Sequence, residues 1–94
     1  MAIIALLYTY TDDLETRMAA RPAHRDFLVA NPGLRLAGAT EADGGIIIVE
    51  ADSAEEVERW SDDDPYQLAG VVATRTVTPW GVALGSWMEP IGLA

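Results

Sequence analysis

The fold is decided by residues 34–51, LRLAGATEADGGIIIVEA, in the middle of the chain. Residues 34–40 alternate two leucines and a glycine with other residues, which is typical of a half-buried strand. Residues 41–45 have the composition of a hairpin turn, and the β-branched run over 45–51 indicates a strand in a central position. The stretch therefore predicts an antiparallel hairpin.

The segment before the hairpin predicts one strand and one helix. Residues 2–10, AIIALLYTY, form a continuous β-rich run, as in a strand covered on both faces. Asp12 or Asp13 then offers an N-cap for a helix that runs to about residue 30. Because Pro22 lies inside this helix, we expect a kink or a break into two short helices near residue 20.

The segment after the hairpin predicts helices followed by a strand. Ser53, with Glu56 three residues later, forms a capping box before apolar residues at helical spacing. The run Ser-Asp-Asp-Asp-Pro at 61–65 ends this helix, and a short helix is expected over 65–69. Residues 71–80, VVATRTVTPW, predict the last strand.

The order β-α-β-β-α-β predicts the ferredoxin-like α+β class, with an antiparallel sheet and both helices on one face. Since half of the residues are hydrophobic, we expect the bare face to pack on a second copy or to form a cavity. A length of 94 residues predicts a single domain over 1–94. For the tail, residues 81–94, we expect an edge strand over 82–87 or a dimer contact.

The composition argues against several classes of partner. The chain has 15 acidic residues, six arginines and no lysine, so its net charge is -9. This charge repels phosphates and anionic lipids, and we expect no nucleic-acid and no membrane partner. A single histidine and no cysteine predict no metal site. The apolar start lacks the basic region of a signal peptide, so we expect a cytoplasmic protein.

The only histidine, His24, shares residues 17–25 with three arginines. On a continuous helix Arg17, Arg21 and His24 lie at i, i+4 and i+7 and share one face. An imidazole titrates near neutral pH and is a common general acid or base. Neighbouring guanidinium groups would hold a carboxylate or phenolate beside it. The alternative is a surface histidine among arginines that pair with the abundant acids.

The stretch WSDDDPYQLAG, residues 60–70, is the second candidate. In a purely structural interpretation, Asp64 caps the helix that starts at Pro65. In a functional interpretation, one of the three carboxylates turns inward and accepts a hydrogen bond from an imidazole, which fixes the tautomer of the ring. The residues alone leave both interpretations open.

The roles of the tyrosines also have two interpretations. Tyr8 and Tyr10 share one side of the first strand, where they line a pocket or pack the sheet. Tyr66, beside Asp64, belongs either to the core or to the flank of a pocket.

Together these segments resemble the YciI-like, or YCII-related, family. The resemblance rests on the motifs R-x-x-x-RPxH at 17–24, S-x-E-E at 53–56, W-x-D-x-DPY-x-x-AGV at 60–71 and V-x-PW at 77–80. These motifs occur in consistent order over about residues 1–80.

The resemblance implies a dimeric α+β barrel in which a histidine and an aspartate form a catalytic dyad. By this match the dyad is His24 and Asp64, with Arg17 and Arg21 at the mouth of a pocket. Relatives suggest proton transfer on small cyclic or aromatic compounds, by elimination or isomerisation, with no metal and no organic cofactor.

We therefore expect a small homodimeric enzyme of the lyase or isomerase type that acts on a small anionic metabolite. His24 would move the proton, Asp64 would orient it, and an arginine would hold an anionic substrate oxygen. The alternative is a non-catalytic dimeric protein that binds a small molecule or serves as an accessory subunit. The expected substrate-binding residues are Arg17, Arg21, Tyr8 and Tyr66.

Overall fold

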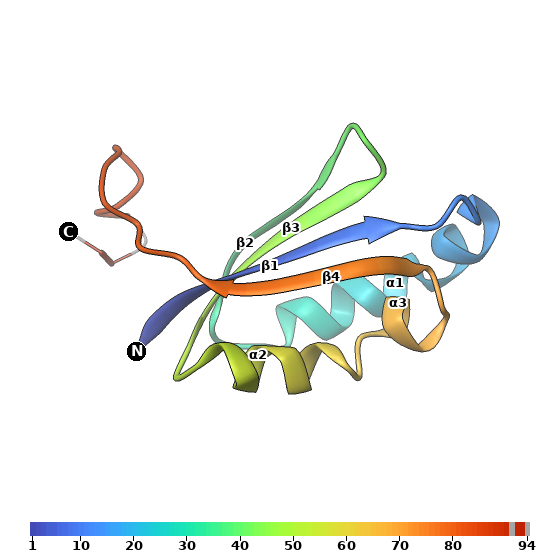
Figure 1. Ribbon diagram of the computed structural model, residues 1–94, viewed down its shortest axis with the longest axis horizontal. Helices are drawn as coiled ribbons and strands as arrows, with labels where there is room; N and C mark the ends of the chain where they lie inside the picture. Colours follow the sequence, from blue (N-terminus) through green and yellow to red (C-terminus); the bar gives the residue numbers. More distant parts are fainter. Residues whose placement is uncertain (91, 94) are drawn as a thin grey trace.

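The computed structural model describes residues 1–90, 92 and 93, and within them it shows four strands and three helices (Figure 1). The elements are β1 (Ala2–Tyr10), α1 (Leu14–Val29), β2 (Leu34–Thr40), β3 (Gly44–Ala51), α2 (Ala54–Ser61), α3 (Pro65–Leu68) and β4 (Val72–Pro79). This order confirms the ferredoxin-like α+β class.

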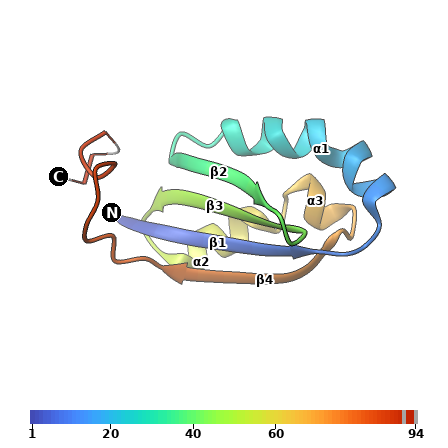
Figure 2. The same ribbon diagram turned by 90° about the horizontal axis from the view of Figure 1, so that it is seen from above.

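The four strands form one antiparallel sheet in the order β2-β3-β1-β4. The two strands with the most continuous apolar runs, β1 and β3, occupy the centre, as their sequences predict. All three helices lie on one side of the sheet (Figure 1). Figure 2 shows α1 running along the β2 side and α2 along the β1–β4 side.

The main hydrophobic core lies between the sheet and the helices. Its residues alternate along the two central strands, because only every second side chain of a strand faces the helices. The buried members of this core are Ile4, Leu6, Tyr8, Leu28, Ile47, Val49, Ala51 and Val57.

The opposite face of the sheet carries a smaller cluster of Ile3, Ala5 and Ile48. Val82 and Leu93 of the tail pack against this cluster. The rest of the face keeps exposed apolar side chains, which are Leu7, Leu36 and Ile46.

Helix α1 is continuous, so the break expected near residue 20 is wrong. Asp13 caps the helix by accepting a hydrogen bond from the Thr16 amide at 3.1 Å. Pro22 lacks an N–H and deprives the Met18 carbonyl of its helical donor. Both residues are exposed, so water can replace that donor and the helix continues through the proline.

The caps of the two later helices agree with the sequence. Ser53 accepts from the Glu56 amide at the start of α2, and Asp64 accepts from the Tyr66 amide at the start of α3. Gly70 ends the last helix with a φ of 73°, a conformation that favours glycine. The turn between α2 and α3 therefore directs the Asp64 side chain toward the sheet.

Strand β2 is more exposed than its alternating pattern predicts, with residues 36–40 all exposed. It lies at an edge of the sheet, and a cavity rather than packed side chains separates it from α1. The expected edge strand over 82–87 is also absent among the described residues. The chain turns away from the sheet after Pro79, and Val82 packs on the outer face instead.

The helices of residues 1–90, 92 and 93 include none that is both long and apolar enough to span a bilayer.

Candidate functional site

His24 and Asp64 meet beneath the sheet, although 40 residues separate them in the chain. The Nδ1 atom of His24, on α1, lies 2.7 Å from Oδ1 of Asp64, which caps α3. Asp64 is completely buried, and His24 is 7% exposed. The same carboxylate thus caps a helix and contacts the imidazole, so the geometry that each interpretation of Asp64 requires is present.

The Asp64 carboxylate accepts three hydrogen bonds. Besides His24, the Tyr66 amide donates to Oδ1 at 2.9 Å and the Tyr8 hydroxyl donates to Oδ2 at 2.9 Å. Because an ionised carboxylate only accepts, Nδ1 of His24 carries the hydrogen of this contact, and in the neutral ring Nε2 keeps a lone pair. Across the described residues every buried side-chain nitrogen and oxygen has a partner, so Nε2, which makes no hydrogen bond, reaches accessible space.

Aromatic rings hold the imidazole from one side. The His24 ring stacks on Tyr66 with centroids 3.7 Å apart and an interplanar angle of 2°. Tyr10 meets Tyr66 edge-on at 5.4 Å, and the Arg17 guanidinium lies 4.6 Å from the centroid of the Tyr10 ring. The plane of the imidazole is therefore set by packing as well as by its hydrogen bond.

A cavity of about 660 Å³ opens beside this histidine, between α1, β2 and the hairpin that joins β2 to β3. This volume suits a small-molecule ligand. Strand β2 contributes mainly apolar residues together with Arg35 and Thr40, and the hairpin contributes Asp43. The near wall, beside His24, is polar. The polar near wall consists of Tyr10, Arg17, Arg21, His24, Arg25 and Tyr66.

The three arginines of this wall differ in their partners. Arg17 is largely buried and engaged, because it lies over Tyr10 and 3.5 Å from the Asp43 carboxylate. Arg21 and Arg25 are exposed, and no carboxylate of the described residues lies within ion-pair distance of either. In a chain with 15 acidic residues, this leaves two guanidinium groups available to an anion at the cavity.

The tyrosines near the site remain neutral donors in the physiological range. Burial raises the pKa of Tyr10 to about 12. Burial, the Asp64 charge and the hydrogen bond to Asp64 raise the pKa of Tyr8 well above its usual value. Burial also raises the pKa of Tyr66, although Arg21 and Arg17 oppose this shift.

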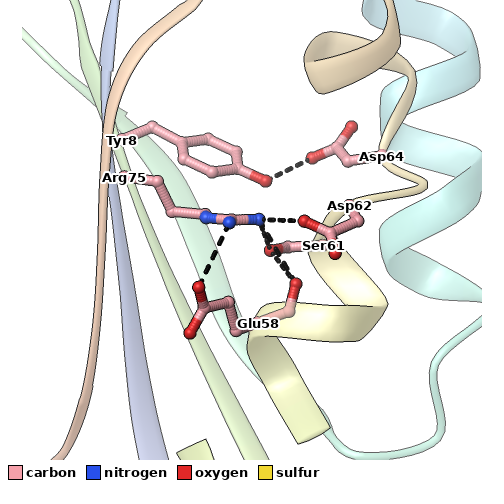
Figure 3. A network of polar contacts seen from close by, with 6 residues as sticks. All are labelled: Tyr8, Glu58, Ser61, Asp62, Asp64 and Arg75. Atoms are coloured by element: carbon pink, nitrogen blue, oxygen red, sulfur yellow. Dashed lines mark hydrogen bonds and ion pairs between the residues drawn. The ribbon is translucent and has the colours of Figure 1, made fainter. Parts of the chain in front are cut away.

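Behind the His24–Asp64 pair, a second polar network holds the turn that carries Asp64. Arg75, on β4, donates to Asp62 at 2.6 Å and to the Ser61 hydroxyl at 3.0 Å, and pairs with Glu58 at 3.4 Å (Figure 3). The register pairs Tyr8 with Arg75 across the β1–β4 ladder. Two neighbouring strands therefore contact the end of α2 and the turn after it.

The structure brings most of the predicted site residues together. Arg17, Arg21, His24 and Tyr66 line one cavity, with Asp64 directly behind the imidazole. Tyr8 does not line the cavity, and its hydroxyl is occupied by Asp64. A direct contact between Tyr8 and a substrate, which the sequence led us to expect, does not fit this geometry.

Within the polar wall, the sequence reasoning missed Arg25 as a cavity residue and left open whether Tyr10 lines a pocket or packs the sheet. Arg25 follows Arg21 at helical i+4 spacing, a signal that could have found it. Tyr10 shares a strand face with Tyr8, but nothing in the sequence indicates which of the two reaches the cavity. Within the described residues no three His, Asp or Glu side chains cluster as metal ligands do.

Comparison with known proteins supports the fold and the family. The sequence profile of the YCII-related domain matches residues 1–81. A search of curated proteins found no match.

Two solved structures illustrate the likeness of the fold. The 5-chloro-2-hydroxyhydroquinone dehydrochlorinase TftG from Burkholderia phenoliruptrix AC1100, in complex with 2,5-dihydroxybenzoquinone, has a TM-score of 0.79 at 22% identity, over 86% of this chain and 95% of that one. An uncharacterized NIPSNAP domain protein from Burkholderia xenovorans has a TM-score of 0.57 at 13% identity, over 88% and 95% of the two chains. At these identities the likeness shows the fold alone.

Proposed function

We propose that this chain, which belongs to the YCII-related domain family, is a small enzyme that transfers a proton with His24 and Asp64 and uses no cofactor. The reaction is an elimination or isomerisation on a small anionic compound with a cyclic or aromatic skeleton. One observation carries the proposal, namely the 2.7 Å contact between a buried carboxylate and an imidazole that lines a cavity.

The geometry suits His24 to act as a general base. Its Nδ1 is occupied by Asp64, so Nε2 is the nitrogen that accepts a proton from a C–H or O–H of the substrate. The electron pair of the broken bond forms a double bond. In an elimination it expels a leaving group, and in an isomerisation another atom is reprotonated. Asp64 stabilises the imidazolium that results.

Arg21 and Arg25 are suited to hold the negative charge of the substrate. Both lie on the helix that carries His24, and neither has a carboxylate partner within the described residues. A guanidinium binds a phenolate or carboxylate by charge-assisted hydrogen bonds. Charge that develops on a substrate oxygen would be stabilised in the same way. Arg17 is assigned to shaping the wall, because Tyr10 and Asp43 already engage it.

The solved neighbour with the same fold supports a lyase assignment. By name it removes the elements of hydrogen chloride from a hydroxylated aromatic ring, and its ligand is a flat, acidic quinone. This is the class of elimination that a histidine base beside arginines can assist. The substrate of this chain is proposed to share the flat ring and the acidic oxygen.

The proposed assembly is a homodimer formed through the outer face of the sheet. Leu7, Leu36 and Ile46 expose apolar side chains there, 38%, 41% and 43% exposed respectively. This face lies opposite the helices (Figure 1). An apolar face of this kind on a small acidic chain is suited to a second copy of itself.

A screen of chlorinated hydroxyhydroquinones and related acidic rings, followed by chloride release and ultraviolet absorbance, tests the enzyme. Turnover is expected in the wild type and is expected to be lost in both His24→Ala and Asp64→Asn. If both variants turn over a true substrate at the wild-type rate, the mechanism is wrong. Ligand binding without turnover that survives His24→Ala but not Arg21→Ala would identify the alternative, a non-catalytic binding protein.

A further inference from the structure

We propose that Tyr8 is a positioning residue that holds the Asp64 carboxylate, and through it the His24 imidazole, by donating its hydroxyl to Oδ2. This inference rests on the proposed function, in which His24 and Asp64 transfer the proton. It assigns to a core residue of β1 a task that neither its packing nor its place in the sequence indicates.

The hydrogen bonds of Asp64 divide between its two oxygens. Oδ1 accepts from the His24 ring and the Tyr66 amide, whereas Tyr8 is the one described donor to Oδ2. The terminal torsion of an aspartate is broad, so bonds to one oxygen leave the carboxylate plane poorly determined. A donor at the second oxygen determines this plane and therefore the direction from which Oδ1 meets the imidazole.

Tyr8 is a rigid anchor for this purpose. It is 3% exposed and lies on a central strand, paired with Gly45 on one side and Arg75 on the other. Figure 3 shows its hydroxyl pointing from the sheet to Asp64, beside the Arg75 contacts that hold the preceding turn. The sheet therefore contacts the Asp64 side chain through Tyr8 and the backbone segment that carries it through Arg75.

The hydroxyl of Tyr8 also limits the charge that Asp64 presents to the ring. A hydrogen bond to a carboxylate stabilises its negative charge and weakens its pull on a nearby imidazolium. Removing this bond leaves the completely buried Oδ2 atom without a hydrogen-bond donor. The negative charge of the carboxylate then acts more strongly on the imidazole. The titration of His24 is therefore expected to depend on a hydroxyl that never touches the ring.

The single histidine makes this dependence directly measurable by NMR of the imidazole nitrogens. Asp64 and Tyr66 contact the ring, and none of the charged or titratable groups beside it changes in Tyr8→Phe. Those that line the same cavity are Tyr10, Arg17, Arg21, Arg25, Arg35 and Asp43. Tyr8→Phe removes one oxygen and keeps the ring packed in the core. Tyr10→Phe is the matched control, since Tyr10 lies on the same strand face and donates no hydrogen bond to Asp64.

The titration midpoint of His24 is expected to rise by about half a pH unit or more in Tyr8→Phe, with a change in tautomer population, and to stay unchanged in Tyr10→Phe. An unchanged midpoint in Tyr8→Phe, alongside a shifted one in Asp64→Asn, would overturn the role of Tyr8 and leave the dyad intact. If the titration midpoint of His24 is also unchanged in Asp64→Asn, the two residues form no dyad. Both the role of Tyr8 and the proposed function would then be overturned.

A measurement on the wild type decides the matter if Tyr8→Phe does not fold. The hydroxyl proton of Tyr8 is expected to exchange slowly with water and to show cross-peaks to the ring protons of its own residue. A hydroxyl proton in fast exchange with water would overturn the positioning role.

Discussion

The imidazole of His24 lies parallel to the phenol ring of Tyr66, with ring centroids 3.7 Å apart. Tyr66 follows Asp64 by two residues, and its amide donates to the same carboxylate oxygen that His24 contacts. The turn at the start of α3 therefore controls the histidine in two ways, through the plane of the ring and through the atom that it bonds. Only Nε2 is left to meet a ligand, and its direction is determined by both contacts.

The stability of the protein is predicted to fall above about pH 10, the usual pKa of a free tyrosine. Burial raises the pKa of Tyr8 in the folded chain, so the folded state keeps a proton that the unfolded state loses. The contribution of Tyr8 to stability is complete below the pKa that this residue has in the unfolded chain. As the pH rises above that pKa, the contribution is lost by about 1.4 kcal/mol per pH unit for each proton retained.

Urea unfolding at about pH 9, 10 and 11, compared between the wild type and Tyr8→Phe, measures this effect. The chain has no lysine and no cysteine, so tyrosines dominate the alkaline titration. We expect the free energy of unfolding to fall less steeply with rising pH in Tyr8→Phe, because this variant lacks the phenol proton that the folded wild type retains. Equal pH slopes in the two proteins would contradict the raised pKa of Tyr8.

Arg21 is predicted to contribute to anion binding. With 2,5-dihydroxybenzoquinone as the probe, Arg21→Gln is expected to weaken binding by about tenfold, which corresponds to about 1.4 kcal/mol. Arg59→Gln removes the same charge from an exposed position on α2 that does not line the cavity, and is expected to leave the affinity unchanged. Isothermal titration calorimetry at low salt compares the two, and equal losses would indicate net charge alone rather than a site at Arg21.

The outer face of the sheet is predicted to form the dimer contact. Ile46→Glu places a charge among the exposed apolar residues of that face and is expected to convert a dimer into a monomer. Leu68→Glu is the matched control, because Leu68 is also exposed but lies on α3, on the helical side. Sedimentation velocity at micromolar concentration distinguishes the two variants, and a monomeric wild type would refute the proposed homodimer.

The arrangement of elements was predictable because local signals agree with the global fold. The apolar runs of β1 and β3 predict that these strands are central. Ser53 and Asp64 lie at the helix starts, where capping residues are favoured. The continuous helix through Pro22 was not predictable, since the cost of a missing N–H depends on whether the freed carbonyl faces water. The sequence does not show that exposure.

The site was predictable in part. The helical spacing of Arg17, Arg21 and His24 places them on one face, and the structure agrees. The bond between Tyr8 and Asp64 joins residues 56 positions apart, and no periodicity reports such a contact. Likewise, only the three-dimensional arrangement shows that Asp43 engages Arg17 and leaves Arg21 available.

The most direct test of the central claim is the titration of the His24 ring in the wild type and in Asp64→Asn. The asparagine keeps one acceptor oxygen for the Tyr66 amide, places an NH2 group toward the Tyr8 hydroxyl, which can accept from it, and removes the charge beside the imidazole. A contact between the two residues predicts that the titration midpoint falls by about one pH unit or more while the fold is retained. An unchanged midpoint in a folded variant would mean that Asp64 is only a helix cap, and that the chain has no dyad.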